Sequence, residues 1–122
     1  MWIYSQYSAE MRHNANLKGV CYSGHGEGEN NPNMQEVKDV GPIPRGKWTI
    51  GPPQDNPQLG KLSMKLHPAE GTDTFGRDDF WIHGDSRANA GQGMASHGCI
   101  VAYLPLRREI ANSQDTELIV VP

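Results

Sequence analysis

Trp81-Ile82-His83-Gly84-Asp85 and Ala95-Ser96-His97-Gly98-Cys99-Ile100 are the two stretches of sequence that decide the fold of this chain. The first stretch ends an apolar run on a His-Gly pair, and the second begins another apolar run after Ser-His-Gly-Cys. Short apolar runs bounded by glycine are typical of strands that are separated by turns. We therefore expect two strands, with His83 at the end of one and Cys99 at the start of the other, facing a cleft.

Short alternating runs between turn residues continue along the rest of the chain, which favours β structure. The 14 glycines and 9 prolines among 122 residues indicate one loop-rich domain rather than a helical bundle. One short helix is expected over Pro105–Ala111, because Pro suits a first helical turn, and a hairpin turn is expected at Asn14–Asn16. The predicted strands are Trp2–Gln6, Glu10–His13, Leu17–Tyr22, Lys47–Ile50, Lys61–His67, Phe80–His83, Ile100–Tyr103 and Glu117–Val121. The predicted fold is therefore mainly β, a sandwich or barrel with long loops and one short helix.

Two segments lack this alternation. His25–Ile43 is polar and rich in Gly and Asn, and it is too long for a simple turn, so we expect a functional loop there. Gly51–Gly60 contains three prolines and is expected to be a surface excursion.

Charge and composition exclude several classes of function. The formal net charge is −3 and there is no basic run, which argues against nucleic-acid or anionic membrane partners. No apolar stretch has the length of a membrane span. The first residues lack the basic and apolar regions of a signal peptide. Of the two cysteines, Cys21 is expected to be a small buried apolar residue.

The residues around Cys99 indicate thiol chemistry. A cysteine becomes a strong nucleophile when an imidazole removes its proton, and His83 and His97 are both candidates for that role. Gly84 and Gly98 give the backbone the freedom to turn N–H groups toward a bound carbonyl. Zinc is a rival use of His83, His97 and Cys99: the close ligand pairs of structural zinc sites are missing, whereas a catalytic site with three ligands stays open on a weak signal. We expect neither a metal nor a cofactor.

These motifs resemble the L,D-transpeptidase (YkuD-like) catalytic domain of bacterial cell-wall enzymes. The signature of that domain is a His-Gly followed, after a gap, by Ser/Thr-His-Gly-Cys, and His83-Gly84 and Ser96–Cys99 match it. Upstream, Gly41–Ile50 is similar to a strand entry of the same domain. With Tyr22–Gly24 and Gly26–Pro32, the chain more closely resembles a short branch deployed as antibacterial effectors of type VI secretion. The matching segments span Val20 to Ala102.

The resemblance implies a role for each site residue. Cys99 is the nucleophile, and His83 is its general base, oriented by the Gly84 carbonyl, with Asp85 as an alternative orienter. The N–H groups of Gly98 and Cys99 form the oxyanion hole, His97 is a pocket wall, and Ser96 caps or braces the turn. Val101 occupies the place where many members of the family carry an arginine that anchors the substrate carboxylate. The arginines that would have to substitute for it are Arg87, Arg107 and Arg108.

The implied function is a cysteine-dependent L,D-transpeptidase or L,D-carboxypeptidase acting on peptidoglycan tetrapeptide stems. It removes or exchanges the terminal D-Ala. The effector branch implies an immunity protein and a secretion-system component as partners, secretion without a signal peptide, and action in the periplasm of a target bacterium. Two alternatives stay open. One is a thiol amidase of NlpC/P60 or CHAP type, in which Cys21 acts with His67 or His83. The other is a non-catalytic peptidoglycan-binding module.

Overall fold

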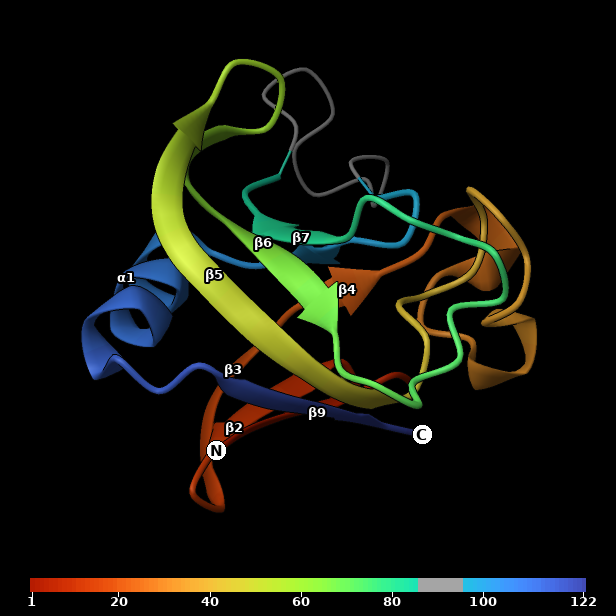
Figure 1. Ribbon diagram of the computed structural model, residues 1–122, viewed down its shortest axis with the longest axis horizontal. Helices are drawn as coiled ribbons and strands as arrows, with labels where there is room; N and C mark the ends of the chain where they lie inside the picture. Colours follow the sequence, from red (N-terminus) through yellow and green to blue (C-terminus); the bar gives the residue numbers. More distant parts are fainter. Residues whose placement is uncertain (86–95) are drawn as a thin grey trace.

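The fold is a single nine-stranded sheet in the order β3-β2-β1-β9-β5-β6-β7-β8-β4 (Figure 1). The computed structural model describes residues 1–85 and 96–122. The strands are β1 (Trp2–Ser5), β2 (Glu10–His13), β3 (Asn16–Val20), β4 (Tyr22–Ser23), β5 (Gly46–Asn56), β6 (Gly60–Pro68), β7 (Trp81–His83), β8 (Ile100–Val101) and β9 (Glu117–Val121). One helix, α1 (Leu104–Ser113), and two 3₁₀ turns, η1 (Gly26–Gly28) and η2 (Pro32–Met34), complete the described elements.

The two edges of the sheet are neighbours in the sequence. Edge strand β3 ends at Val20 and the opposite edge strand β4 begins at Tyr22, so only Cys21 separates them. The chain thereby draws the edges of the sheet together, and the sheet curls into a nearly closed barrel. Closure of this kind reduces the exposed edge that would otherwise invite pairing with other chains. The fold class predicted from the sequence, mainly β with a barrel and one short helix, is confirmed.

Local signals in the sequence account for much of this topology. β1, β2 and β3 form an antiparallel meander, and the β2–β3 turn contains Asn14 and Ala15, both with positive φ. The predicted hairpin turn is thus confirmed, and Asn14 supplies a residue type that tolerates this backbone. The predicted helix is also confirmed, beginning at Leu104 and ending at Ser113 with Pro105 in its first turn.

Two expectations from the sequence were wrong. Leu17–Tyr22 is two strands rather than one, because the chain leaves β2 after Val20 and pairs with β8 from Tyr22 onward. Gly51–Gly60 lies at the surface as expected, but it is mostly strand rather than irregular, because β5 continues to Asn56 as a hairpin with β6. β9 pairs with β5 only as far as Thr49, so the prolines that follow face an unpaired edge, where a missing N–H is tolerated. The pairing of β5 with β6 shifts register between Ile50 and Pro53 and again between Gln54 and Asn56.

The core fills the inside of the barrel. Its buried side chains include Trp2, Tyr4, Met11, Trp48, Met64, Leu66, Ile82, Ile100 and Leu118. Trp48 packs edge-to-face on Phe80, with ring centroids 5.1 Å apart, and both residues belong to the core. Helix α1 adds Leu106 and Ile110 to the core, and in Figure 1 it lies on the side opposite η1 and η2. Among the described residues, no helix is long and apolar enough to cross a membrane.

Candidate active site

Strands β7 and β8 bring His83 and Cys99 to one region of the sheet. The two strands are parallel neighbours, with Ile82 paired with Ile100 and His83 paired with Val101. Because side chains alternate along a strand, Ile82 and Ile100 point into the core and His83 and Val101 point to the other face. Cys99 immediately precedes β8 and lies two residues before Val101, so it is on the diagonal from His83.

The imidazole of His83 is held in one orientation. Its Nδ1–H donates to the Gly84 carbonyl oxygen at 2.6 Å, because a carbonyl can only accept. Nε2 therefore carries the lone pair, and this buried atom has no hydrogen-bond partner among the described residues. Burial is the main cause that lowers the pKa of His83, and Arg107 lowers it further, while the Gly84 carbonyl and Asp85 oppose them. The result is a neutral imidazole with an available proton acceptor.

The thiol of Cys99 is half-buried beside the start of β7. Its Sγ lies 3.7 Å from the Asp79 carbonyl oxygen. Burial raises the pKa of Cys99 to about 11, against lowering contributions from the Trp81 backbone N–H and from Arg77. The resting cysteine is therefore a thiol and not the thiolate expected from a neighbouring imidazole. Nucleophilic attack from this state requires a base that takes the proton as the bond forms.

Two buried hydroxyls hold the turn before Cys99. Ser96 Oγ accepts from the N–H groups of Gly24 at 2.9 Å and Gly98 at 3.1 Å, and it donates to the Cys99 carbonyl at 2.6 Å. Ser23 Oγ donates to the Gly98 carbonyl at 3.1 Å and accepts from the Ile43 N–H at 2.9 Å. Ser96 thus braces the turn. Because the Gly98 N–H is occupied, an oxyanion hole that uses it requires the bond to Ser96 to break.

His97 lies at the surface, unlike His83. Its side chain is exposed, and its ring centroid is 5.9 Å from that of His25, which comes from the long loop after β4. The Nδ1 atom of His25 is buried and has no hydrogen-bond partner among the described residues. The two imidazoles therefore lie side by side, His97 from the turn before Cys99 and His25 from the long loop.

Arg77 was not identified from the sequence. It is buried, and its guanidinium donates to four backbone carbonyls. Nη1 donates to the Gln35 carbonyl and also to the Pro42 carbonyl, the latter at 2.9 Å. Nη2 donates to the Gly41 carbonyl at 2.9 Å and to the His97 carbonyl at 3.3 Å. Its guanidinium carbon also lies 5.2 Å from the Phe80 ring centroid. Arg77 therefore ties the long loop to the turn that carries Cys99. Its place in Gly76-Arg77-Asp78 resembles an ordinary surface turn, so only its burial distinguishes it.

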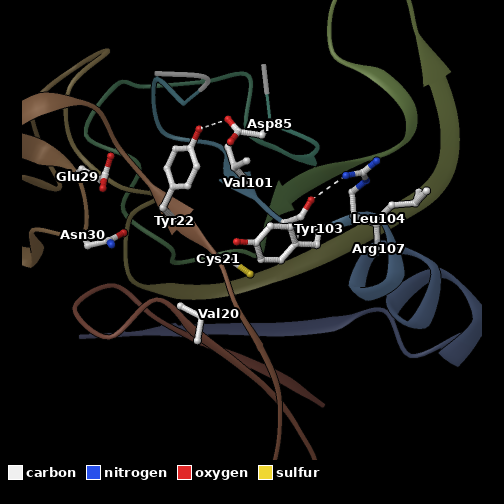
Figure 2. A pocket seen from close by; sticks show the side chains of 11 residues that line it. Val20, Cys21, Tyr22, Glu29, Asn30, Asp85, Val101, Tyr103, Leu104 and Arg107 are labelled. Atoms are coloured by element: carbon white, nitrogen blue, oxygen red, sulfur yellow. Dashed lines mark hydrogen bonds between the residues drawn. The ribbon is translucent and has the colours of Figure 1, made fainter. Parts of the chain in front are cut away.

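Arg107 lies close to His83 on the other side of the site. It comes from the buried face of α1, and its Nη1 donates to the Ala102 carbonyl at 2.7 Å. A cavity of about 360 Å³ opens beside it (Figure 2). On another wall of this cavity, Tyr22 Oη donates to Asp85 Oδ1 at 2.6 Å. Arg108 is exposed, and Arg87 lies outside the described residues.

A second, more open hollow of about 500 Å³ lies near the thiol. Arg77, Asp79 and Phe80 are among its lining residues, and Asp79 is the residue whose carbonyl approaches Cys99. Among the described residues, no group of three or more His, Cys, Asp or Glu is arranged to hold a metal ion. The region thus contains a thiol and a neutral imidazole, and a residue next in sequence to His83 or in contact with Cys99 lines or adjoins each hollow.

Taken together, the fold and the site define a small β-barrel protein with a buried histidine and a cysteine at adjoining strand ends. The model of the Tlde1 domain family matches residues 18–121, which is most of the chain, so the protein belongs to the Tlde1 domain family, a family of type VI secretion effector domains. A search of curated proteins found no match.

Proposed function

We propose that this protein is an antibacterial effector enzyme that acts on peptidoglycan tetrapeptide stems as an L,D-carboxypeptidase or L,D-transpeptidase. One observation carries the proposal: His83 Nε2, which has no hydrogen-bond partner among the described residues, belongs to the strand next to β8, and β8 begins directly after Cys99. A fixed imidazole with a free lone pair near a protonated thiol is the arrangement that general-base activation of a cysteine needs.

The chemical steps follow from the roles of these two residues. Cys99 Sγ attacks the carbonyl that joins the third residue of the stem to the terminal D-Ala, and His83 Nε2 takes the thiol proton. The tetrahedral intermediate then collapses to a thioester, and His83 returns the proton to the departing amine of D-Ala. Water completes hydrolysis, whereas a free D-amino acid or an amine of another stem peptide completes transfer. In each case the attacking group loses a proton and Cys99 regains one.

Stabilisation of the oxyanion is assigned to backbone N–H groups at the Cys99 turn. Such donors contribute most when they are fixed before the reaction begins. In the resting state Ser96 Oγ occupies the Gly98 N–H, so the Cys99 N–H is the donor that we propose acts first. Ser96 and Ser23 hold the peptide planes of this turn, and their contribution is to its geometry.

The proposed reaction is tested with purified protein and disaccharide-tetrapeptide, alone and with free D-Met, with products read by mass spectrometry. We expect loss of terminal D-Ala or its replacement by D-Met. Cys99→Ala should abolish both products, whereas the matched variant Cys21→Ala should retain them. Turnover that survives Cys99→Ala and is lost in Cys21→Ala would instead support a thiol amidase that uses Cys21.

The structure disfavours the Cys21 alternative. Cys21 is only 8% exposed, and burial raises the pKa of its thiol to about 12, with no cause that lowers it. A buried thiol with a raised pKa is a poor nucleophile. The remaining alternative, a non-catalytic binding module, predicts that wild type and Cys99→Ala bind sacculi equally and that neither changes the peptide.

The effector role is tested in cells. We propose delivery by a secretion system, action in the periplasm of the target, and neutralisation in the producer by an immunity protein that covers the site around His83 and Cys99. Wild-type protein directed to the periplasm should therefore lyse or arrest bacteria, and cytosolic expression should not. Cys99→Ala in the periplasm is the matched control. Harmlessness of the wild type in both compartments would contradict the proposal.

A further inference from the structure

The thiol of Cys99 is bonded to a backbone carbonyl and not to the imidazole of His83. Its Sγ donates to the Asp79 carbonyl oxygen at 3.7 Å. His83 Nε2 has no hydrogen-bond partner in the part of the chain that the structure describes, which includes Cys99. Burial is the main cause that raises the pKa of Cys99 to about 11, so the proton stays on the sulfur. The resting nucleophile is therefore held by a carbonyl rather than by its proposed base.

Asp79 and His83 lie on opposite sides of Cys99 along the direction of β7. Ile82 is level with Ile100 in the parallel register, so the residue before Ile82 is level with Cys99. His83 lies two residues beyond that level, and Asp79 lies two residues before it. A thiol has one proton to donate, so it bonds either to the Asp79 carbonyl or to His83 Nε2. Activation of Cys99 by His83 therefore requires the sulfur to leave Asp79.

The Asp79 carbonyl is fixed in place by its surroundings. The backbone of Asp79 has a φ of +65°, a conformation that Asp adopts more readily than most residues. Its side chain accepts a hydrogen bond from Trp81 Nε1 at 2.9 Å, and the next residue, Phe80, is buried. Unusual backbone conformations of this kind are often found at ligand-binding positions. The carbonyl is thus a preset hydrogen-bond acceptor that only the thiol occupies.

The space beside this carbonyl suits the acyl half of the substrate. Asp79, Arg77 and Phe80 line the hollow of about 500 Å³, a size within the range of roughly 300–1,000 Å³ that is common for ligand sites. In the proposed reaction His83 returns a proton to the departing amine, so the terminal D-Ala leaves on the His83 side of the sulfur. The third residue of the stem stays bonded to the sulfur. It therefore lies on the opposite side, where Asp79 and the hollow are.

We infer that the Asp79 carbonyl accepts the backbone N–H of the third residue of the stem peptide, and that this bond displaces the Cys99 thiol toward His83. The inference rests on the proposed function. Only the α-carbon separates this N–H from the carbonyl carbon that the sulfur attacks, so the N–H comes within reach of Asp79. An amide N–H is also a stronger donor than a thiol, which favours the exchange. The displaced thiol then donates to His83 Nε2, and the nucleophile is activated only when a stem peptide is bound.

Nuclear magnetic resonance of the His83 Nε2 atom tests the displacement without turnover. The protein is labelled with ¹⁵N-histidine, and the probe is a stem tripeptide amide, which carries the third-residue N–H but no terminal D-Ala. In the free protein the Nε2 resonance should be the same in wild type and in Cys99→Ala, after thermal unfolding has shown that the variant is folded. The tripeptide amide should shift this resonance in wild type and much less in Cys99→Ala. An ester analogue, in which oxygen replaces the third-residue N–H, should bind without this difference.

Turnover of matched tetrapeptides gives a second measurement. The ester analogue at the third residue should lower kcat about 10–100-fold, the loss expected when a hydrogen bond that places the nucleophile is removed. An ester placed one linkage earlier in the stem is the control and should retain the kcat of the all-amide tetrapeptide. Equal kcat values for the two esters would overturn the inference and leave the reaction established.

The resonance measurement also separates this inference from the proposed reaction. A free-protein Nε2 resonance that already differs between wild type and Cys99→Ala would mean that the thiol is bonded to His83 without substrate, which would overturn the displacement. A shift that depends on both the third-residue N–H and Cys99 supports the displacement, even if wild type turns over no tetrapeptide.

Discussion

A β-carbon built on Gly98 would lie 2.5 Å from Nη2 of Arg77 and 2.9 Å from the ring of Phe80. The Gly98 backbone also has a φ of +130°, which side chains rarely allow. The same guanidinium holds the His97 carbonyl and three carbonyls of the long loop. The residue before Cys99 is therefore glycine for two reasons: the backbone conformation and the close approach of a buried arginine.

Gly98→Ala should consequently destabilise the fold and slow the reaction of Cys99. The φ strain alone costs about 1–3 kcal/mol, and the displacement of Arg77 adds to it. Gly60→Ala is the matched control, because Gly60 has a φ of +98° with no atom within 4 Å of the added carbon. Urea denaturation measures stability, and iodoacetamide alkylation measures the thiol. If both variants lose the same stability and Cys99 reacts normally in each, the close approach of Arg77 to Gly98 affects neither the stability of the fold nor the reactivity of the thiol.

The acid limb of the pH–rate profile should lie below pH 6.5, which is the ordinary pKa of a histidine side chain. The proposed catalysis needs neutral His83, and burial and Arg107 lower the pKa of this residue, so the proposed active form persists to lower pH than it would for a free imidazole. Arg107→Gln removes a contribution that lowers the pKa of His83, so the acid limb of kcat/KM should move to higher pH. Asp85→Asn removes a contribution that raises the pKa of His83, so the acid limb should move to lower pH. Shifts in the same direction for both variants would contradict this electrostatic account.

Ser96→Ala should be more damaging than a typical loss of a buried hydroxyl. It leaves the Gly24 and Gly98 N–H groups without their acceptor, and each unsatisfied buried donor costs about 1–3 kcal/mol. Ser63→Ala is the control, because Ser63 is equally buried but makes one hydrogen bond, to the Gly60 carbonyl. In thermal unfolding, Ser96→Ala should lose more stability than Ser63→Ala. Only Ser96→Ala should lower the alkylation rate of Cys99. Equal losses would mean that the turn does not depend on Ser96.

Short-range patterns explain why the fold class could be predicted from the sequence. Alternation identified β2 and β9 with their observed bounds, and His-Gly with Ser-His-Gly-Cys identified the end of β7 and the start of β8. The closure of the barrel at Cys21 could not be predicted in this way. The residues on both sides of Cys21 have strand character, and only pairing with distant partners divides them.

Sequence motifs mark the residues of the candidate site, but they carry no information on its electrostatics. His83 and Cys99 are marked by motifs, whereas the burial of Arg77 depends on carbonyls up to 42 residues away in sequence. Arg107 was one of three candidate arginines, and its position over Gly84 follows from how α1 packs. The raised pKa of Cys99 is likewise a result of burial that no local pattern encodes.

Alkaline pH should destabilise the folded protein through its two cysteines. Burial raises the pKa of Cys21 to about 12 and that of Cys99 to about 11, from an ordinary value of 9.0. Below pH 9 both thiols are protonated in the folded and unfolded chains, so they add no pH dependence. Above pH 9 the unfolded chain loses protons that the folded chain keeps, and each thiol costs up to roughly 1.4 kcal/mol per pH unit until its folded pKa is reached. Urea midpoints at about pH 8 and pH 10 should therefore differ, and Cys21→Ala should show about half of the difference. A pH dependence unchanged in Cys21→Ala would mean that the Cys21 thiol is not as strongly buried as the structure shows.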